Sequence, residues 1–252
     1  MYFLALATDY DGTIAHHGRV DAETVAAMRS LRESGRRLIL VTGRELPDLK
    51  RVCPELDMFD RVVAENGALL FNPATEEERA LTPPPPAAFV QRLQERNVEP
   101  LSVGRSIVAT WEPHQTAVLE VIRELGLELQ IIFNKGAVMV LPSGMNKAAG
   151  LAAALEELEL SFHNVIGVGD AENDHAFLAS CGCSAAVANA VPMVTEAADI
   201  ALQNDHGAGV VELINMICRN DAEILPPARN GIVLGVDRDG HDVFLQSLAA
   251  AC

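Results

Sequence analysis

Residues 4–13 read LALATDYDGT, and this stretch decides the fold. The apolar run from Phe3 to Ala7 predicts a short buried strand. Asp9 and Asp11 follow it one residue apart, directly before the turn at Gly12. In open parallel sheets the carboxyl ends of the strands border the ligand crevice. Alternation along a strand puts both acids on one face, where their charges repel unless a cation lies between them or one is protonated. The stretch therefore predicts a chemical site at the edge of an α/β sheet.

The composition excludes several classes of protein. The chain has 252 residues, 49% of them hydrophobic, which is enough for a sizeable core. Acidic residues outnumber basic ones 35 to 19 and no basic run occurs, so we expect no nucleic-acid partner. No apolar run approaches the length of a membrane span, so we expect no membrane partner. The five cysteines show no disulfide spacing, which favours reduced thiols and a cytoplasmic protein.

Strand and helix signals alternate over residues 1–82 and resume at residue 143. The expected elements before the break are a helix from Asp21 to residue 34, a strand at 37–41, a helix at 46–52 and strands at 62–64 and 68–71. Those after it are a helix at 146–158, a strand at 164–168, a helix at 172–179, short strands at 184–187 and 200–202, and a helix at 207–217. Such alternation predicts a doubly wound, Rossmann-like parallel sheet with helices on both faces.

A run of four prolines, Pro83 to Pro86, interrupts this pattern. The segment behind it predicts two helices (87–96 and 114–125), a strand (106–111) and a hairpin (128–133 and 137–141). We therefore expect a catalytic core of residues 1–82 and 143–225 with an inserted α+β cap of residues 83–142. Residues 226–252 predict a C-terminal hairpin, whose apolar side needs the core, a further domain or a partner to cover it.

Four polar motifs follow predicted core strands or open the next helix. They are Asp9-x-Asp11, Thr42-Gly43-Arg44, Lys147 and Asp170-x-x-Asn173-Asp174. Because these positions converge on one crevice in a doubly wound sheet, we expect four carboxylates and one ammonium to meet there. Several hard oxygen ligands of this kind suit Mg²⁺.

The order and content of these motifs resemble the haloacid dehalogenase superfamily of phosphatases. The α+β cap between the second and third motifs is similar to that of the Cof-type subgroup, as are Asn66-Gly67-Ala68 and Ala188-Asn189-Ala190. The cap is similar in size to that of archaeal-type phosphoglycolate phosphatases. The resemblance covers residues 1 to about 218.

The resemblance implies a role for each motif. Asp9 would be the nucleophile that forms an aspartyl-phosphate, and Asp11 the general acid and base. The phosphoryl group would contact Thr42, Gly43, Arg44, Lys147 and Asn173, with Thr42 and Lys147 also catalytic. The Mg²⁺ ligands would be Asp9, Asp11 through its backbone carbonyl, Asp170 and Asp174.

Structural interpretations stay open for several of these residues. Thr42 can cap the following helix, Arg44 can pair with Glu45 or Asp48, and Asn173 and Asp174 can cap the helix they open. Lys147 can be an ordinary lysine, although a helix N-terminus disfavours positive charge and so indicates an anionic partner. Glu65 and Glu172 are interpreted as structural or solvated. Five cap residues are each interpreted as cap surface or cap core, with at least one expected to contact substrate: Arg105, Trp111, His114, Asn134 and Lys135.

We therefore expect a Mg²⁺-dependent phosphomonoester hydrolase that acts on a small phosphorylated metabolite, either phosphoglycolate or a compact sugar phosphate. One alternative is a phosphomutase or phosphotransferase with the same intermediate. The other is a regulatory, phosphate-sensing module of a larger chain, which the C-terminal tail suggests and the complete set of acids argues against.

Overall fold

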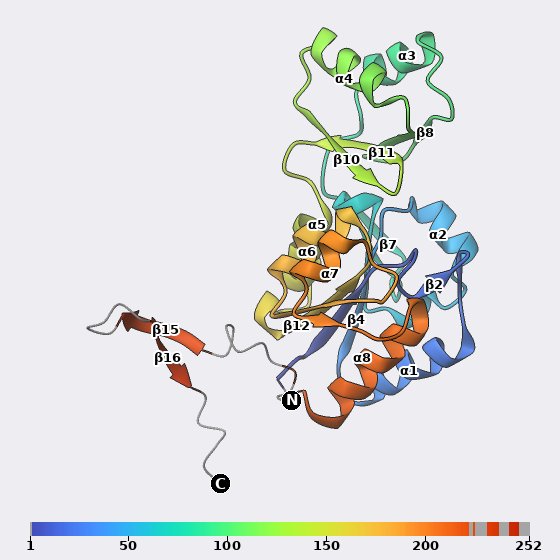
Figure 1. Ribbon diagram of the computed structural model, residues 1–252. Helices are drawn as coiled ribbons and strands as arrows, with labels where there is room; N and C mark the ends of the chain where they lie inside the picture. Colours follow the sequence, from blue (N-terminus) through green and yellow to red (C-terminus); the bar gives the residue numbers. More distant parts are fainter. Residues whose placement is uncertain (1, 222–223, 225–230, 237–241, 247–252) are drawn as a thin grey trace.

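The computed structural model describes residues 2–221, 224, 231–236 and 242–246. Its main element is an eight-stranded sheet in the order β14-β13-β12-β1-β4-β5-β6-β7 (Figure 1). The strands are β1 (Ala5–Thr8), β4 (Arg37–Val41), β5 (Arg61–Ala64), β6 (Leu69–Asn72), β7 (Glu77–Ala80), β12 (Val165–Gly169), β13 (Cys183–Ala186) and β14 (Ile200–Ala201). Pairing is parallel from β14 to β5, whereas β6 and β7 run antiparallel to their neighbours.

Helices cover both faces of this sheet. The first hydrophobic cluster packs α1 (Ala22–Glu33), α2 (Leu46–Val52) and α8 (His206–Asn220) on one face, where Leu6 of β1 points. The second cluster packs α5 (Lys147–Glu157), α6 (His175–Ser180) and α7 (Pro192–Ala197) on the other face, where Ala5 and Ala7 point. A central parallel strand buried on both faces reads as an unbroken apolar run, which explains the sequence of β1.

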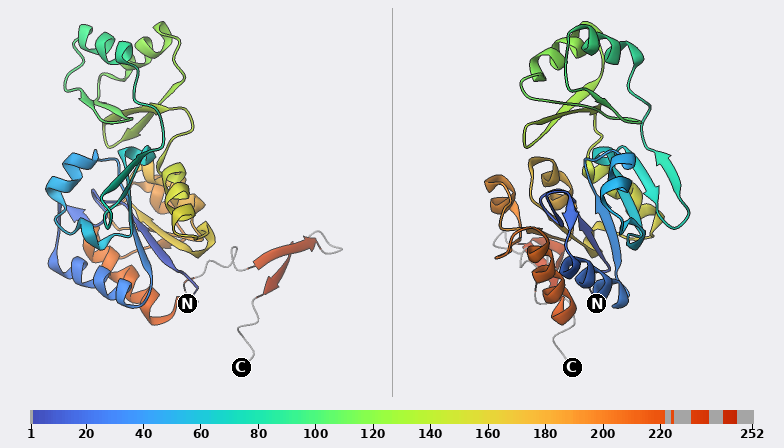
Figure 2. Two further views of the ribbon diagram at one scale, coloured as in Figure 1. Left: turned by 180° about the vertical axis from the view of Figure 1, so that it is seen from behind. Right: turned by 90° about the vertical axis from the view of Figure 1, so that its right-hand side faces the viewer.

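The inserted segment between β7 and α5 forms a separate layer above the core (Figures 1 and 2). It contains an antiparallel sheet in the order β10-β11-β9-β8. Its elements are α3 (Ala87–Glu95), β8 (Ser102–Val103), β9 (Val108–Trp111), α4 (Gln115–Glu124), β10 (Leu129–Asn134) and β11 (Ala137–Pro142). Phe89, Val118 and Val138 belong to its own hydrophobic cluster, which joins the two helices to one face of the sheet. The other face is turned to the core.

The predicted fold class is confirmed, with some elements added. The sheet is mostly parallel rather than wholly so, because β6 returns through a turn after β5 and β7 extends that edge. The sequence did not predict β7, β8, α7 or the β2–β3 hairpin (Ala15–His16 and Arg19–Val20). It also did not predict the 3₁₀ turns Leu56–Met58, Glu65–Gly67 and Phe162–Asn164. In β7 the sequence Glu77–Ala80 is polar and three of its four residues are exposed, so it carries no apolar alternation to detect. The limits 83–142 of the cap remain a prediction.

The predicted C-terminal hairpin falls partly on described residues. There, β15 (Gly231–Val236) pairs antiparallel with β16 (Asp242–Gln246). The rest of residues 226–252 lies outside the described part of the chain. Among the described residues no helix has the length and apolarity to cross a membrane.

A buried ion pair closes the core where α8 ends. The Asp221 carboxylate accepts from Arg36 Nη2 at 2.9 Å and from the backbone amides of Tyr2 and Phe3 at 2.8 and 3.2 Å. Burial by itself raises the pKa of Asp221, but these hydrogen bonds outweigh burial and hold that pKa below its ordinary value. Because the folded pKa is the lower one, the stabilisation is present above the unfolded pKa and disappears as the pH falls through the folded pKa.

Replacing Asp221 by Asn is expected to lower the free energy of unfolding by about 2–4 kcal/mol at neutral pH, because Arg36 then stays buried without its counter-charge. The difference from the unsubstituted protein should shrink towards about pH 3.5. Urea denaturation at both pH values measures it, with the exposed Asp57→Asn as the matched control. An Asp221→Asn protein as stable as the control at neutral pH contradicts this account.

Candidate active site

A buried lysine holds two acids together at the edge of the core sheet. Lys147 Nζ lies 2.5 Å from Asp9 Oδ1 and 2.5 Å from Asp174 Oδ1. All three residues are buried, and Lys147 is only 1% exposed. Lys147 is the first residue of α5, whose N-cap Asn146 accepts a hydrogen bond from Ala149 N. The helix dipole disfavours an ammonium at that position. Burial lowers the pKa of Lys147, but the charges of Asp174 and Asp9 outweigh burial and raise this pKa above its ordinary value.

The loop after β12 brings Asp170 and Asp174 to the same place. Asp174 Oδ2 accepts from the backbone amides of Asp170 and Ala171, each at 2.9 Å, so Asp174 caps its turn and also faces Lys147. Asp170 Oδ1 accepts from the Thr13 hydroxyl at 2.8 Å, and Oδ2 forms an ion pair with Lys135 from the cap. At Gly12, where φ is +87°, a Cβ would lie 2.3 Å from Asp170 Oδ2, so only glycine fits.

Three carboxylates in this cluster have the geometry of a cation site. Asp9, Asp170 and Asp174 each offer an oxygen, and these oxygens lie within 4.8 Å of one another. Burial, and next the charge of Asp174, raise the pKa of Asp9 well above its ordinary value despite Lys147. The same two causes raise the pKa of Asp170. Buried carboxylates that repel one another are stabilised by a cation between them, and an all-oxygen donor set suits a hard divalent ion.

The Asp11 carboxylate is not part of this cluster. It makes a bidentate ion pair with Arg44, with distances of 2.6 Å to Nε and 2.7 Å to Nη2. Arg44 also pairs with Asp48, one of its two predicted partners. Asp9 and Asp11 both line the cavity under the cap, but strand alternation is not the reason, because β1 ends at Thr8, before either acid. The Asp11 side chain is outside the cation cluster, and its backbone carbonyl remains the predicted ligand.

The remaining predicted phosphate-binding residues lie around the turn after β4. The buried Thr42 hydroxyl accepts from Arg44 N at 3.1 Å, but it does not cap α2, whose N-cap residue is Glu45. The interpretation of Thr42 as a helix cap was therefore wrong. Asn173 Nδ2 donates to Asn66 Oδ1 at 2.9 Å, and both side chains approach Gly43. Buried Asn66 Nδ2 and Asn173 Oδ1 have no hydrogen-bond partner among the described residues. This amide pair therefore leaves one donor and one acceptor unused beside Gly43.

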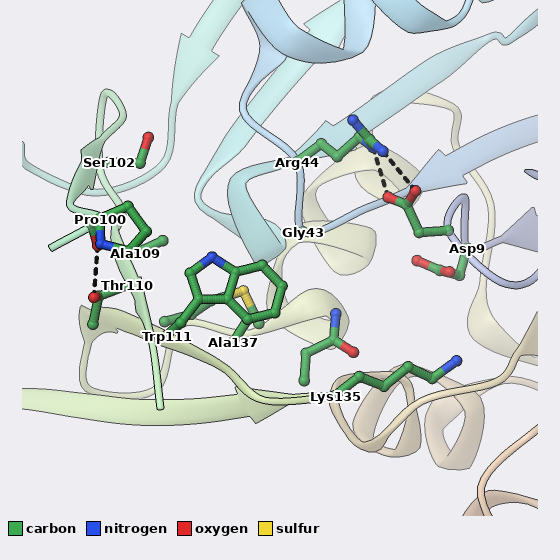
Figure 3. Close-up of a pocket in the computed structure, with 13 residues that line it drawn as sticks. Asp9, Gly43, Arg44, Pro100, Ser102, Ala109, Thr110, Trp111, Lys135 and Ala137 are labelled. Atoms are coloured by element: carbon green, nitrogen blue, oxygen red, sulfur yellow. Dashed lines mark hydrogen bonds and ion pairs between the residues drawn. The ribbon is translucent and has the colours of Figure 1, made fainter. Parts of the chain in front are cut away.

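A cavity of about 480 Å³ separates this edge of the core from the cap (Figure 3). Its core side is formed by Asp9, Asp11, Gly43 and Arg44. Its cap side is formed by Pro100, Ser102, Ala109, Thr110, Trp111, Asn134, Lys135, Ala137 and Met139. Small-molecule sites are commonly cavities of about 300–1,000 Å³ at domain interfaces, so this cavity has the size and position of a ligand site.

The cap residues singled out from the sequence divide into two groups. Trp111, Asn134 and Lys135 line the cavity. Arg105 pairs with Glu78, and the His114 ring contacts the Glu99 carbonyl. The interpretation of Lys135 as cap surface or cap core was wrong, because its ammonium reaches Asp170 of the core.

Sequence reasoning missed how two loops are fastened to the site. The buried Glu65 carboxylate accepts from the backbone amides of Arg105, Ser106 and Ile107 at 2.8–3.1 Å, and so ties the core to the cap. This is a structural role, as interpreted. Asn189 Nδ2 donates to the Gly12 carbonyl at 2.7 Å and holds the first loop. The signal that the sequence offered for Glu65 was an acidic residue directly before the Asn66-Gly67 turn.

The fold and the site place the chain among α/β proteins that have an inserted cap over a buried group of acids. The chain belongs to the haloacid dehalogenase-like hydrolase family, which it matches over residues 6–108 and 115–214. The expectation of a haloacid dehalogenase-type phosphatase is thereby confirmed at the level of the family.

Individual relatives agree with this assignment. The chain is 31% identical over 219 residues to the phosphoglycolate phosphatase of Methanothermobacter thermautotrophicus, covering 83% of this chain and 96% of the relative. It is 27% identical to phosphoglycolate phosphatase 2 of Saccharolobus solfataricus, covering 85% and 92%. Among solved structures, a haloacid dehalogenase-like hydrolase from Bacteroides thetaiotaomicron has the same fold, with a TM-score of 0.71 and 18% identity over 85% of this chain and 99% of that one.

Proposed function

We propose that the protein is a Mg²⁺-dependent phosphatase of small phosphorylated metabolites, with phosphoglycolate as its first candidate substrate, and that it works through an aspartyl-phosphate on Asp9. The observation that carries this proposal is the Asp9 carboxylate itself. It is 4% exposed, held by Lys147, placed among two further acids, and open to the cavity under the cap. The names of the curated relatives support the choice of substrate.

The donor set of the cluster fits Mg²⁺. Asp9, Asp170, Asp174 and the Asp11 backbone carbonyl would hold the ion, which supplies charge neutralisation of the phosphoryl oxygens when bound. Lys147, which pairs with Asp9, would orient that carboxylate and neutralise charge on the transferring group. Three groups would donate hydrogen bonds to the phosphoryl oxygens. They are the hydroxyl of Thr42, the backbone amide of Gly43 and the side-chain amide of Asn173.

Asp9 would attack phosphorus, forming a new O–P bond while the bond to the leaving-group oxygen breaks. That oxygen would take a proton from Asp11. The anionic phosphate ester would draw Arg44 away from Asp11, which leaves Asp11 available to carry the proton. In the second step Asp11 would accept a proton from the water that hydrolyses the aspartyl-phosphate.

The test is phosphate release from phosphoglycolate with Mg²⁺ and with EDTA, using Asp11→Asn as the diagnostic variant. Asp11→Asn should reduce kcat/KM for phosphoglycolate, which reports formation of the aspartyl-phosphate, by about 10²–10⁴-fold, because an alkoxide leaving group needs its proton. Its kcat/KM for p-nitrophenyl phosphate should fall far less, since the nitrophenolate leaves without protonation, whereas kcat can fall for both esters because Asp11 also serves the second step.

Equal losses of kcat/KM on both esters would remove Asp11 from the acid role, and undiminished turnover in EDTA would contradict a metal-dependent reaction. Transfer of the phosphoryl group to a second sugar hydroxyl instead of water would favour a phosphotransferase. Asp48→Asn is the matched control, because Asp48 also contacts Arg44 but lies outside the cavity lining.

A further inference from the structure

One cap lysine reaches into the core acids. Lys135 occupies the turn between β10 and β11, where Lys135 and Gly136 have φ values of +46° and +86°. This turn contacts the loop that follows β12, where Lys135 N lies 3.4 Å from Glu172 Oε2. The Lys135 ammonium pairs with Asp170, whose side chain is completely buried. In Figure 3 the Lys135 side chain extends from the edge of the cap towards the side on which Asp9 lies.

The charges of the cluster show which cation gives way when a divalent ion binds. Three carboxylates, of Asp9, Asp170 and Asp174, face two ammonium groups. Lys147 is 1% exposed and bonded to two acids, whereas the Lys135 side chain is 45% exposed and bonded to one. An ammonium and a divalent ion on the same carboxylate repel each other. Lys135 is therefore the cation that leaves.

A released Lys135 stays on the wall of the cavity. Among the described residues, the cationic side chains that line the cavity are Arg44 and Lys135. Arg44 pairs with Asp11 and Asp48, and in the proposed reaction it leaves Asp11 for the phosphoryl group, not for the other end of the substrate. The rest of the cap side is neutral, formed by residues such as Ser102, Thr110 and Trp111. Once Asp170 binds the ion, the Lys135 ammonium has lost its ion-pair partner. A carboxylate on the substrate would give it a new one.

We propose that Lys135 selects phosphate esters whose leaving group carries a carboxylate, and that it becomes available to this carboxylate when the divalent ion takes its place on Asp170. The inference rests on the proposed function and adds to it the chemical class of the substrate and the residue that recognises it. Lys135 thus links occupation of the cation site to recognition at the far end of the substrate.

The first experiment compares two esters of matched size, phosphoglycolate and 2-hydroxyethyl phosphate, in which a hydroxymethyl group replaces the carboxylate. The unsubstituted enzyme should have the higher kcat/KM for phosphoglycolate. Lys135→Met should reduce the ratio of the two kcat/KM values about tenfold or more, because one charged hydrogen bond is lost for one ester only. Lys135→Arg should keep most of the ratio. Lys50→Met, which removes a lysine paired with Glu78 outside the cavity lining, should leave it unchanged.

The second experiment needs no turnover. Calorimetric titration of the substrate-free protein with Mg²⁺ should show several-fold tighter binding to Lys135→Met than to the unsubstituted protein or Lys50→Met, because no ammonium has to be displaced.

The results distinguish failure of the proposed function from failure of the role of Lys135. If the unsubstituted enzyme hydrolyses neither ester, the proposed function fails and this inference fails with it. If it hydrolyses phosphoglycolate but Lys135→Met keeps the same ratio, or binds Mg²⁺ no more tightly, only the role of Lys135 is overturned.

Discussion

Replacing Asp9 by Asn is expected to reduce kcat for phosphoglycolate hydrolysis at least about a thousandfold. An amide is not a nucleophile towards phosphorus, so the covalent step cannot occur. The same change removes one acid from the cation cluster and one of the two partners of Lys147. Steady-state phosphate release at saturating Mg²⁺ and substrate measures the loss.

The folded state should tolerate Asp9→Asn. Burial raises the pKa of Asp9, so a neutral side chain is less costly at this position than at an exposed one. Urea denaturation should therefore show a folded variant. Asp205→Asn, at a side chain that is 68% exposed, is the matched control for the chemistry of the substitution and should keep full activity. Turnover by Asp9→Asn within about tenfold of the unsubstituted enzyme contradicts a nucleophilic Asp9.

Replacing Lys147 by Met is expected to affect both stability and catalysis. The buried carboxylates of Asp9 and Asp174 then lose their shared counter-charge, which should lower the free energy of unfolding by about 3–5 kcal/mol at about pH 8 in EDTA. Turnover should fall about 10²–10³-fold, as when a preorganised electrostatic contact is removed. Urea denaturation and phosphate release measure the two effects.

The pH dependence of this variant has a defined sign. Burial and Asp174 raise the pKa of Asp9, and Lys147 opposes them, so the pKa should rise further in Lys147→Met. A folded pKa above the unfolded one means that stability is kept below the unfolded pKa and lost as the pH rises through the folded value. The deficit of Lys147→Met should therefore shrink from about pH 8 to about pH 5. A deficit that is absent at about pH 8, or equal to that of Lys50→Met, contradicts the role assigned to Lys147.

The parts of this site that could be predicted are those governed by local rules. The apolar run before Asp9 marks a central strand, and the carboxyl ends of parallel strands share one edge. These two facts were enough to predict that Asp9, Lys147, Asp170 and Asp174 meet, and the structure brings them together.

The parts that could not be predicted depend on how the layers are oriented. The pairing of Arg44 with Asp11 depends on how the chain turns after Thr8, which a strand-alternation argument does not describe. The pairing of Lys135 with Asp170 depends on how the cap sits over the core, and no periodicity in residues 83–142 encodes that placement. Glu65 accepts from three backbone amides that are 40–42 residues further along the chain. These contacts also depend on how the cap sits over the core.

The most direct measurement is rapid acid quenching of the enzyme during turnover of phosphoglycolate with Mg²⁺, followed by peptide mass spectrometry. The account predicts a phosphoryl group on the peptide that contains Asp9, located on that side chain, and none when EDTA replaces Mg²⁺. A phosphoryl group on a different residue, or full turnover while the Asp9 peptide remains unmodified at every quench time, would contradict it.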